Sequence, residues 1–201
     1  STLDVIRNLE DKYKVVALSA NSQWELLSKQ IEEFKPESVS LADERYVDSL
    51  RNSLSGNSVQ VLTGANSVKE MVSRENVDIV LSAIVGGAGL PAAIEVIKNK
   101  KTLAIANKEA LVMAGGLIMP MAKDNGVNII PVDSEHSAVL QALRSGRREE
   151  VKKIIITASG GPFRNHPKEK LSEVTKEQAL NHPTWSMGDK ITIDSATMMN
   201  K

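Results

Sequence analysis

Short apolar runs alternate with segments of helical periodicity along most of this 201-residue chain. Residues 77–85 (VDIVLSAIV) predict a strand that is buried on both faces, as parallel strands usually are. Residues 23–34 carry apolar side chains at helical spacing, and Pro36 ends that pattern. The alternation predicts an α/β fold with a parallel, doubly wound sheet and right-handed crossovers.

The other expected elements follow the same rhythm. Further strands are expected at residues 14–20, 38–41, 58–63, 102–106 and 127–132. Further helices are expected at residues 2–8, 43–54, 67–73, 90–99, within 110–125 after Gly116, and at 138–143. A second pattern begins near residue 149, with strands expected at 151–158 and 190–194, a helical stretch at 167–180 and a loop at 182–189. We therefore place a domain boundary at about residue 148, between a first domain (1–148) and part of a second α/β domain (149–201).

Composition excludes several classes of function. Lys and Arg together number 25, as do Asp and Glu, so the formal net charge is zero and no basic surface for nucleic acid is expected. The chain has no cysteine, which rules out disulfides and thiol chemistry and fits a cytoplasmic protein. No apolar run reaches the roughly 18–20 residues that span a bilayer, and the N-terminus does not resemble a signal peptide. We expect neither nucleic acid nor a membrane as partner.

Two carboxylates, Asp133 and Glu135, follow the apolar run at residues 127–132 and precede a helical pattern. In an open α/β sheet, ligands bind at the carboxyl ends of the strands. Two hard oxygen ligands at this spacing suit Mg²⁺ or Mn²⁺. The alternative is an ordinary helix start, in which Asp133 or Ser134 is the N-cap and the helix dipole favours the acidic residues.

Two more stretches follow expected strands in the first domain. Residues 86–89 (GGAG) could bring backbone amides close to a phosphate, or could be a tight turn between strand and helix. Asn107, Lys108 and Glu109 could bind a polar ligand, or could be a solvated turn with a local ion pair.

Three stretches of the second domain also carry reactive or polar side chains. Residues 157–163 (TASGGPF) suit an anion-binding nest or a simple turn. Residues 182–188 (HPTWSMG) suit a lid, with Trp185 as the alternative anchor of the loop on the core. Residues 194–201 (DSATMMNK) suit a helix capped by Asp194 or Ser195, with or without a phosphate at its beginning.

In combination, five of these stretches resemble the 1-deoxy-D-xylulose 5-phosphate reductoisomerase family: residues 106–109, 131–136, 159–163, 182–188 and 194–201. The similarity is collinear from Ser1 to Lys201. It implies a Rossmann-like NADPH-binding domain followed by part of a catalytic domain, usually in a homodimer, in the cytoplasm or a plastid stroma. It implies an enzyme that rearranges 1-deoxy-D-xylulose 5-phosphate and reduces it with NADPH to 2-C-methyl-D-erythritol 4-phosphate, in non-mevalonate isoprenoid synthesis.

The resemblance also assigns residues. Asp133 and Glu135 match two of three carboxylates that hold Mg²⁺ or Mn²⁺, where the metal acts as a Lewis acid. Glu135 and Lys108 match catalytic positions. Matches to substrate contacts are Lys108, Ser134, Glu135, Ser159, His182, Trp185, Ser195, Asn200 and Lys201. Matches to cofactor contacts are Asn21, Ser22, Gln23, Asn107, Glu109 and Gly188. No Arg or Lys lies in the turn at residues 20–23, so the preference for NADP over NAD comes from the family alone.

The chain departs from the family pattern at both ends. It starts after the position of the family's glycine-rich pyrophosphate loop and stops before the third metal carboxylate and the C-terminal helical domain. We therefore expect an internal fragment of the enzyme. The alternatives are a truncated piece that binds ligands without turnover, and an unrelated regulatory module that binds a dinucleotide. A regulatory module would not need both the acidic pair and the Trp185 loop.

Overall fold

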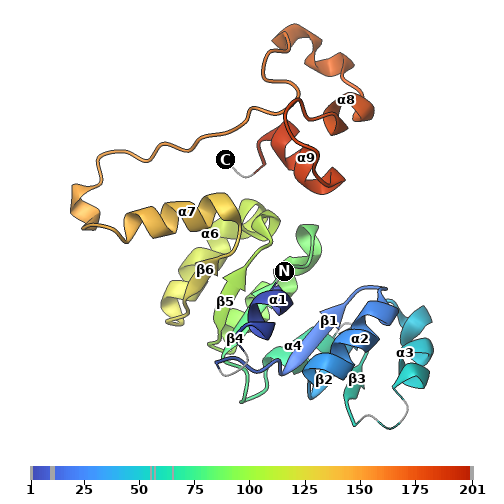
Figure 1. Ribbon diagram of the computed structural model, residues 1–201. Coiled ribbons are helices and arrows are strands. Elements are labelled where there is room, and N and C mark those ends of the chain that lie inside the picture. The colour runs from blue at the N-terminus through green and yellow to red at the C-terminus, as the bar shows by residue number, and fades with distance from the viewer. Residues whose placement is uncertain (1, 10–11, 55, 57, 65, 200–201) are drawn as a thin grey trace. The chain divides into compact units, whose positions relative to one another are not determined.

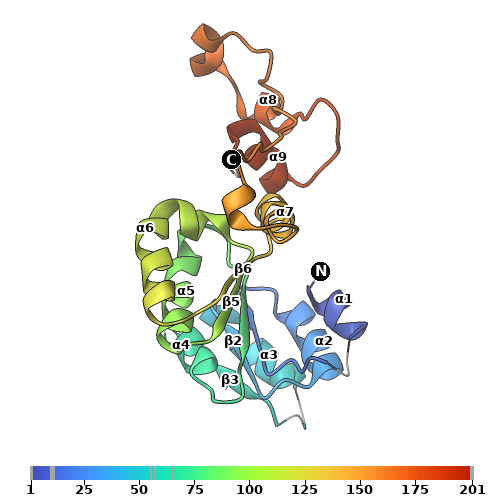
Figure 2. The ribbon, with the colours of Figure 1, turned by 90° about the vertical axis from the view of Figure 1, so that its left-hand side faces the viewer.

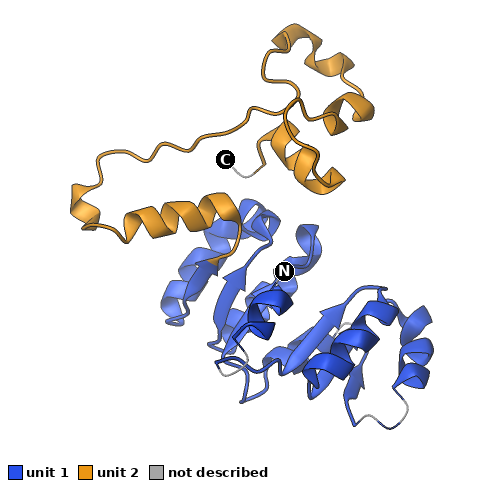
Figure 3. Ribbon diagram, in the orientation of Figure 1, with its two compact units in different colours: residues 1–130 blue, residues 131–201 orange. Residues whose placement is uncertain are grey.

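The computed structural model describes residues 2–9, 12–54, 56, 58–64 and 66–199. The chain forms two compact units, Ser1–Ile130 and Pro131–Lys201, which Figure 3 shows in separate colours. Helices and strands alternate through the first unit, and the second contains helices joined by long connections (Figure 1). The sequence predicted that the cofactor-binding domain ends near residue 148, and this boundary stays a prediction.

Parallel strands separated by helices make up the first unit, as the sequence predicted. Its strands are β1 (Ala17–Ala20), β2 (Ser38–Leu41), β3 (Gln60–Leu62), β4 (Ile79–Ser82), β5 (Thr102–Ile105) and β6 (Ile129–Pro131), whose last residue opens the second unit. Its helices are α1 (Thr2–Arg7), α2 (Trp24–Phe34), α3 (Val47–Ser53), α4 (Ser67–Val72), α5 (Leu90–Lys98) and α6 (Lys108–Asp124). The strands form two sheets, β1-β2-β3 and β4-β5-β6. β1 and β3 both run parallel to β2, and β4 runs parallel to β5.

β2 is buried on both faces because its side chains alternate between two helical layers. Val39 and Leu41 belong to a core cluster with residues of α2 and α3. Ser40 lies on the other face, where its hydroxyl donates to the Ser67 hydroxyl of α4 at 2.7 Å. Helices therefore cover both faces of this sheet, which is the doubly wound arrangement.

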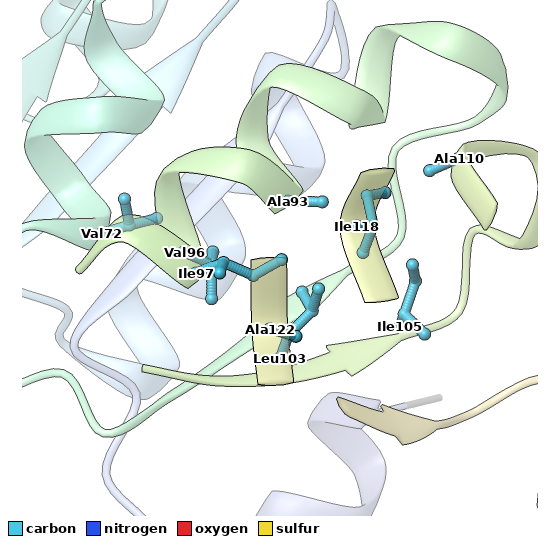
Figure 4. Packing of buried hydrophobic residues seen from close by; sticks show 9 residues of the cluster. All are labelled: Val72, Ala93, Val96, Ile97, Leu103, Ile105, Ala110, Ile118 and Ala122. Carbon is cyan, nitrogen blue, oxygen red and sulfur yellow. The ribbon is translucent and has the colours of Figure 1, made fainter. Parts of the chain in front are cut away.

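The second sheet packs one face against α5 and α6, as Figure 2 shows. Figure 4 shows its core, which consists of Val72, Ala93, Val96, Ile97, Leu103, Ile105, Ala110, Ile118 and Ala122. The expectation that residues 77–85 are buried on both faces is wrong for β4. Val80 packs against the core, whereas Ile79 and Leu81 point to the other face and are 48% and 37% exposed.

α6 begins at Lys108, earlier than the expected start after Gly116. Asn107 is its N-cap, and the Asn107 side chain accepts a hydrogen bond from the backbone N–H of Ala110 at 3.1 Å. A kink at Ala114 (φ −142°, ψ 23°) divides α6 into two helical parts, and Gly115 and Gly116 follow the kink directly. The part after the kink lies where the sequence predicted a helix.

The second unit contains α7 (Ser134–Leu143), α8 (Lys176–Leu180) and α9 (Asp189–Thr197). The strand expected at residues 151–158 is wrong: the segment is extended but pairs with no strand of the described residues, and Ile154, Ile155 and Ile156 are exposed. A strand needs a neighbour to satisfy its backbone groups. The strand expected at 190–194 is also wrong, because these residues lie in α9, whose backbone hydrogen bonds are local.

Candidate active site

The turn at Asn21, Ser22 and Gln23 lies at the carboxyl end of β1 and leads into α2, where Gln23 is the N-cap. The backbone N–H of Asp43 donates to the Asn21 carbonyl at 2.9 Å, so the end of β2 lies beside this turn. The Arg45 guanidinium binds the Asp43 carboxylate at 2.7 Å and lowers the pKa of Asp43. Arg45 was missed in the sequence because it follows a different strand, although the parallel pairing of β1 with β2 brings the two strand ends together.

Asn107 joins the carboxyl ends of β4 and β5. Its buried side-chain amide donates to the carbonyls of Ile84 and Gly86 and thereby holds the glycine turn at residues 86–89. Gly86 has φ +73°, which favours glycine. The close approach also explains Gly89, where an added Cβ would lie 2.2 Å from the Asn107 amide nitrogen.

Lys108 and Glu109 open α6, directly after Asn107. Lys108 is only 6% exposed, which is uncommon for a lysine, and Glu109 is half-buried. The structure therefore places the six predicted residues of this unit at the carboxyl ends of β1 and β5, the edge at which parallel sheets bind ligands.

Asp133 and Glu135 lie at the start of α7, immediately after β6. Asp133 occupies the N-cap position, so the ordinary reading of a helix start is correct for its backbone. Its side chain makes no capping hydrogen bond to α7 and is only 10% exposed. The Ser134 hydroxyl donates to the Glu135 carboxylate at 2.6 Å and fixes its orientation.

Three of the predicted phosphate and lid residues form one cluster in the second unit. The Ser159 Oγ lies 3.1 Å from His182 Nε2 and 3.0 Å from Ser195 Oγ, and it accepts the backbone N–H of Gly161 at 3.3 Å. Gly161 has φ +62°, and an added Cβ would lie 2.6 Å from the Ser195 carbonyl oxygen. Arg164, which the sequence analysis did not single out, donates to the Ser159 carbonyl at 3.4 Å. The sequence feature that could have indicated Arg164 is its position five residues after Ser159, following two glycines.

The loop after α8 curls around His182. The rings of His182 and Trp185 stack with centroids 5.2 Å apart and planes 11° apart. A pocket of about 330 Å³ is lined by residues 180–187 and Thr192. Trp185 is 56% exposed, so it does not anchor the loop in the core. Gly188 ends the loop as the N-cap of α9.

The expected cap at Asp194 or Ser195 is wrong. Both residues lie within α9, which starts at Asp189 because the backbone N–H of Thr192 already bonds the Gly188 carbonyl. Ser195 therefore reaches Ser159 from the last turns of the helix. Asn200 and Lys201, which were expected near a helix start, lie outside the described residues.

The donor chemistry at Asp133 and Glu135 fits a divalent metal, since both offer hard oxygen ligands next to a strand end. No group of three His, Cys, Asp or Glu residues with metal-binding geometry occurs within the described ranges. Two carboxylates alone leave most coordination positions of Mg²⁺ or Mn²⁺ to other ligands. No helix in the described part of the chain is long and apolar enough to cross a bilayer.

Known proteins resemble both parts of the chain. Residues 1–115 match the family model of 1-deoxy-D-xylulose 5-phosphate reductoisomerase, and residues 129–201 match that of its C-terminal domain. Proteins of this name from Geotalea uraniireducens and Thermoanaerobacter pseudethanolicus are 53% and 50% identical over the whole chain. The chain covers 52% of each of them.

Solved structures agree. The reductoisomerase from Zymomonas mobilis in complex with NADPH is 41% identical with a TM-score of 0.86, over 99% of this chain and 51% of that one. A second reductoisomerase, in complex with NADPH, fosmidomycin and magnesium, is 37% identical with a TM-score of 0.81, over 99% of this chain and 52% of that one. The chain spans about half the length of these relatives, and it belongs to the 1-deoxy-D-xylulose 5-phosphate reductoisomerase family.

Proposed function

We propose that this chain forms the NADPH-binding part and much of the catalytic part of an enzyme that converts 1-deoxy-D-xylulose 5-phosphate to 2-C-methyl-D-erythritol 4-phosphate. The observation that carries the proposal is the Ser159–His182–Ser195 cluster, with Trp185 stacked on His182. Hydroxyl groups, a backbone nest and an aromatic loop together suit a phosphate held next to a short carbon chain.

NADPH is proposed to bind along the carboxyl ends of β1, β4 and β5, where Asn21, Ser22, Gln23 and Glu109 lie. Asn107 would hold the glycine turn in place beside it, because its amide already bonds the turn's carbonyls. Gly188 is proposed as a further cofactor contact. Arg45, beside the Asn21 turn, provides a cation near the proposed adenosine end.

Asp133 and Glu135 would hold Mg²⁺ or Mn²⁺, which when bound supplies Lewis-acid polarisation of the substrate ketone. Ser134 orients the Glu135 carboxylate by its 2.6 Å hydrogen bond. Lys108 is proposed to donate a hydrogen bond to a substrate oxygen. Ser159 and Ser195, with Asn200 and Lys201, would bind the phosphate, while His182 and Trp185 exclude water from the carbon chain.

A second reading is that the 201 residues bind ligands without turnover. The homodimer and the cytoplasmic or stromal location implied by the family stay predictions.

The acidic pair provides the first test. We expect the 201-residue chain to bind Mn²⁺, with Asp133→Asn and Glu135→Gln each weakening binding by about tenfold or more, because each removes a charged ligand. Asp189→Asn is the matched control, since Asp189 is an exposed carboxylate at the start of another helix of the same unit. Electron paramagnetic resonance of free Mn²⁺ measures the binding. Equal affinities in all four proteins would contradict the metal assignment.

A further inference from the structure

The two ring nitrogens of His182 have different partners. Its Nδ1 accepts the backbone N–H groups of Thr184 at 3.1 Å and Trp185 at 3.0 Å. A ring nitrogen that accepts hydrogen bonds carries its lone pair there, so the hydrogen of the neutral imidazole lies on Nε2. The backbone of the loop therefore selects the tautomer of its own histidine.

The tautomer fixes the direction of the next hydrogen bonds. Since Nε2 carries the hydrogen, His182 donates to the Ser159 Oγ over 3.1 Å. The same oxygen accepts the N–H of Gly161. A hydroxyl oxygen accepts two hydrogen bonds and donates one, so the Ser159 hydrogen goes to the Ser195 Oγ, 3.0 Å away.

Ser195 is the end of this chain of donors. Its oxygen accepts from Ser159, and no other hydrogen bond of its side chain occurs among the residues the structure describes. Its own hydroxyl hydrogen thus remains for an acceptor outside the cluster. A hydroxyl hydrogen directed at such an acceptor suits an anionic oxygen, because hydrogen bonds to charged acceptors are the stronger ones.

We propose that His182 is a positioning residue: it polarises the series His182→Ser159→Ser195 so that Ser195 presents a hydrogen to a phosphate oxygen. The same imidazole also holds the 182–188 loop, because the Trp185 backbone N–H donates to Nδ1 and the Trp185 ring stacks on the imidazole. The conformation of the loop and the direction of the hydrogen bonds therefore depend on one side chain. The choice of phosphate as ligand rests on the proposed function, whereas the tautomer and the direction of the hydrogen bonds do not.

Two amide variants separate the two roles. His182→Asn places an acceptor near the position of Nδ1 but is too short to reach Ser159. His182→Gln places a donor near the position of Nε2 but leaves the Thr184 and Trp185 N–H groups without their acceptor. The matched control is His166→Gln, because His166 belongs to the same unit and its ring lies 3.3 Å from the Lys170 carbonyl instead.

We expect nitrogen-15 spectra of the 201-residue chain, which has three histidines, to show His182 as the Nε2–H tautomer. Inorganic phosphate should bind His182→Asn about tenfold more weakly than the unchanged chain, because without the His182 donor the Ser195 hydrogen is no longer held toward the phosphate, and one hydrogen bond to an anion is worth about this factor. His182→Gln and His166→Gln should bind within about threefold of the unchanged chain. Trp185 fluorescence should change in both His182 variants, because each removes the ring that stacks on Trp185.

A double variant tests whether His182 acts through Ser159. If it does, adding His182→Asn to Ser159→Ala should weaken phosphate binding no further, because coupled residues are not additive. An Nδ1–H tautomer, full additivity, or equal binding by the Asn and Gln variants would overturn the proposal. The correct tautomer without any phosphate binding by the unchanged chain would reject the phosphate pocket itself, and with it this part of the proposed function.

Discussion

Gly89→Ala tests how the two strand ends of the first unit are held together. Gly89 has φ −77° and ψ −15°, which alanine adopts without strain, so only the space around the new methyl group matters. That methyl would lie 2.2 Å from the Asn107 amide nitrogen and 2.9 Å from the Ile84 carbonyl oxygen. Asn107 would have to leave its position in the buried turn.

The cost follows from what Asn107 does there. Displacement of its amide breaks the hydrogen bonds to the Ile84 and Gly86 carbonyls, which costs about 2 kcal/mol. Overpacking adds about 1–3 kcal/mol. We therefore expect Gly89→Ala to lower the free energy of unfolding of the first unit by about 3–5 kcal/mol.

Gly116→Ala is the matched control. An added Cβ at Gly116 meets nothing within 4 Å, and the residue lies inside α6, so alanine should stabilise by about 0.5–1 kcal/mol. Urea unfolding should be followed by Trp24 fluorescence in a Trp185→Phe background, because Trp24 lies in the first unit. Equal midpoints for the two alanine variants would refute the steric argument.

Two further predictions concern the first unit. Hydrogen bonds from Lys14 and, to a smaller extent, from Asn76 lower the pKa of Glu37. The Glu37 carboxylate therefore stabilises the fold above its ordinary pKa and loses that effect as the pH falls through the lowered value. Glu37→Gln should lower the urea midpoint at neutral pH and make no difference in acid, whereas a difference that does not change with pH would contradict the ion pair. Ile97→Ala should lower the free energy of unfolding by about 2–5 kcal/mol, since Ile97 is fully buried. Ile79→Ala should lower it by less than about 1 kcal/mol, because Ile79 is 48% exposed. Similar losses for both variants in urea titrations would contradict this difference in burial.

Local periodicity was sufficient to predict most of the first unit. β2 alternates between small polar and large apolar side chains because helices cover both of its faces, and the sequence shows that alternation directly. The burial of β4 could not be predicted in the same way. Its composition suits two covered faces, yet whether a layer lies over Ile79 and Leu81 depends on tertiary contacts.

The second unit shows where local signals fail. Residues 151–158 have strong strand propensity, but propensity does not supply the neighbouring strand that pairing requires. Residues 190–194 alternate as a strand would, yet the helix that starts after Gly188 satisfies their backbone groups within the segment itself. Tertiary and local hydrogen bonds overrode the pattern at both places.

The contacts within the candidate site could not be predicted from the spacing of residues in the sequence. His182 and Ser195 lie 23 and 36 residues after Ser159, so no local pattern connects the three, and only the resemblance to the family assigns all of them to substrate contacts. The role of Asn107 as a clamp on the glycine turn depends on contacts across 21 residues, which no local pattern encodes. The N-cap position of Asp133, by contrast, was one of two readings of the local sequence.

We propose that these residues belong to an enzyme that rearranges and reduces a sugar phosphate. The most direct measurement is the oxidation of NADPH in the presence of 1-deoxy-D-xylulose 5-phosphate and Mn²⁺. It should be made with the 201-residue chain and with a protein extended at both ends to the length of the relatives, each with and without Asp133→Asn. We expect turnover by the extended protein that Asp133→Asn abolishes. An extended, folded protein that binds Mn²⁺ and NADPH but leaves this substrate unchanged would contradict the claim.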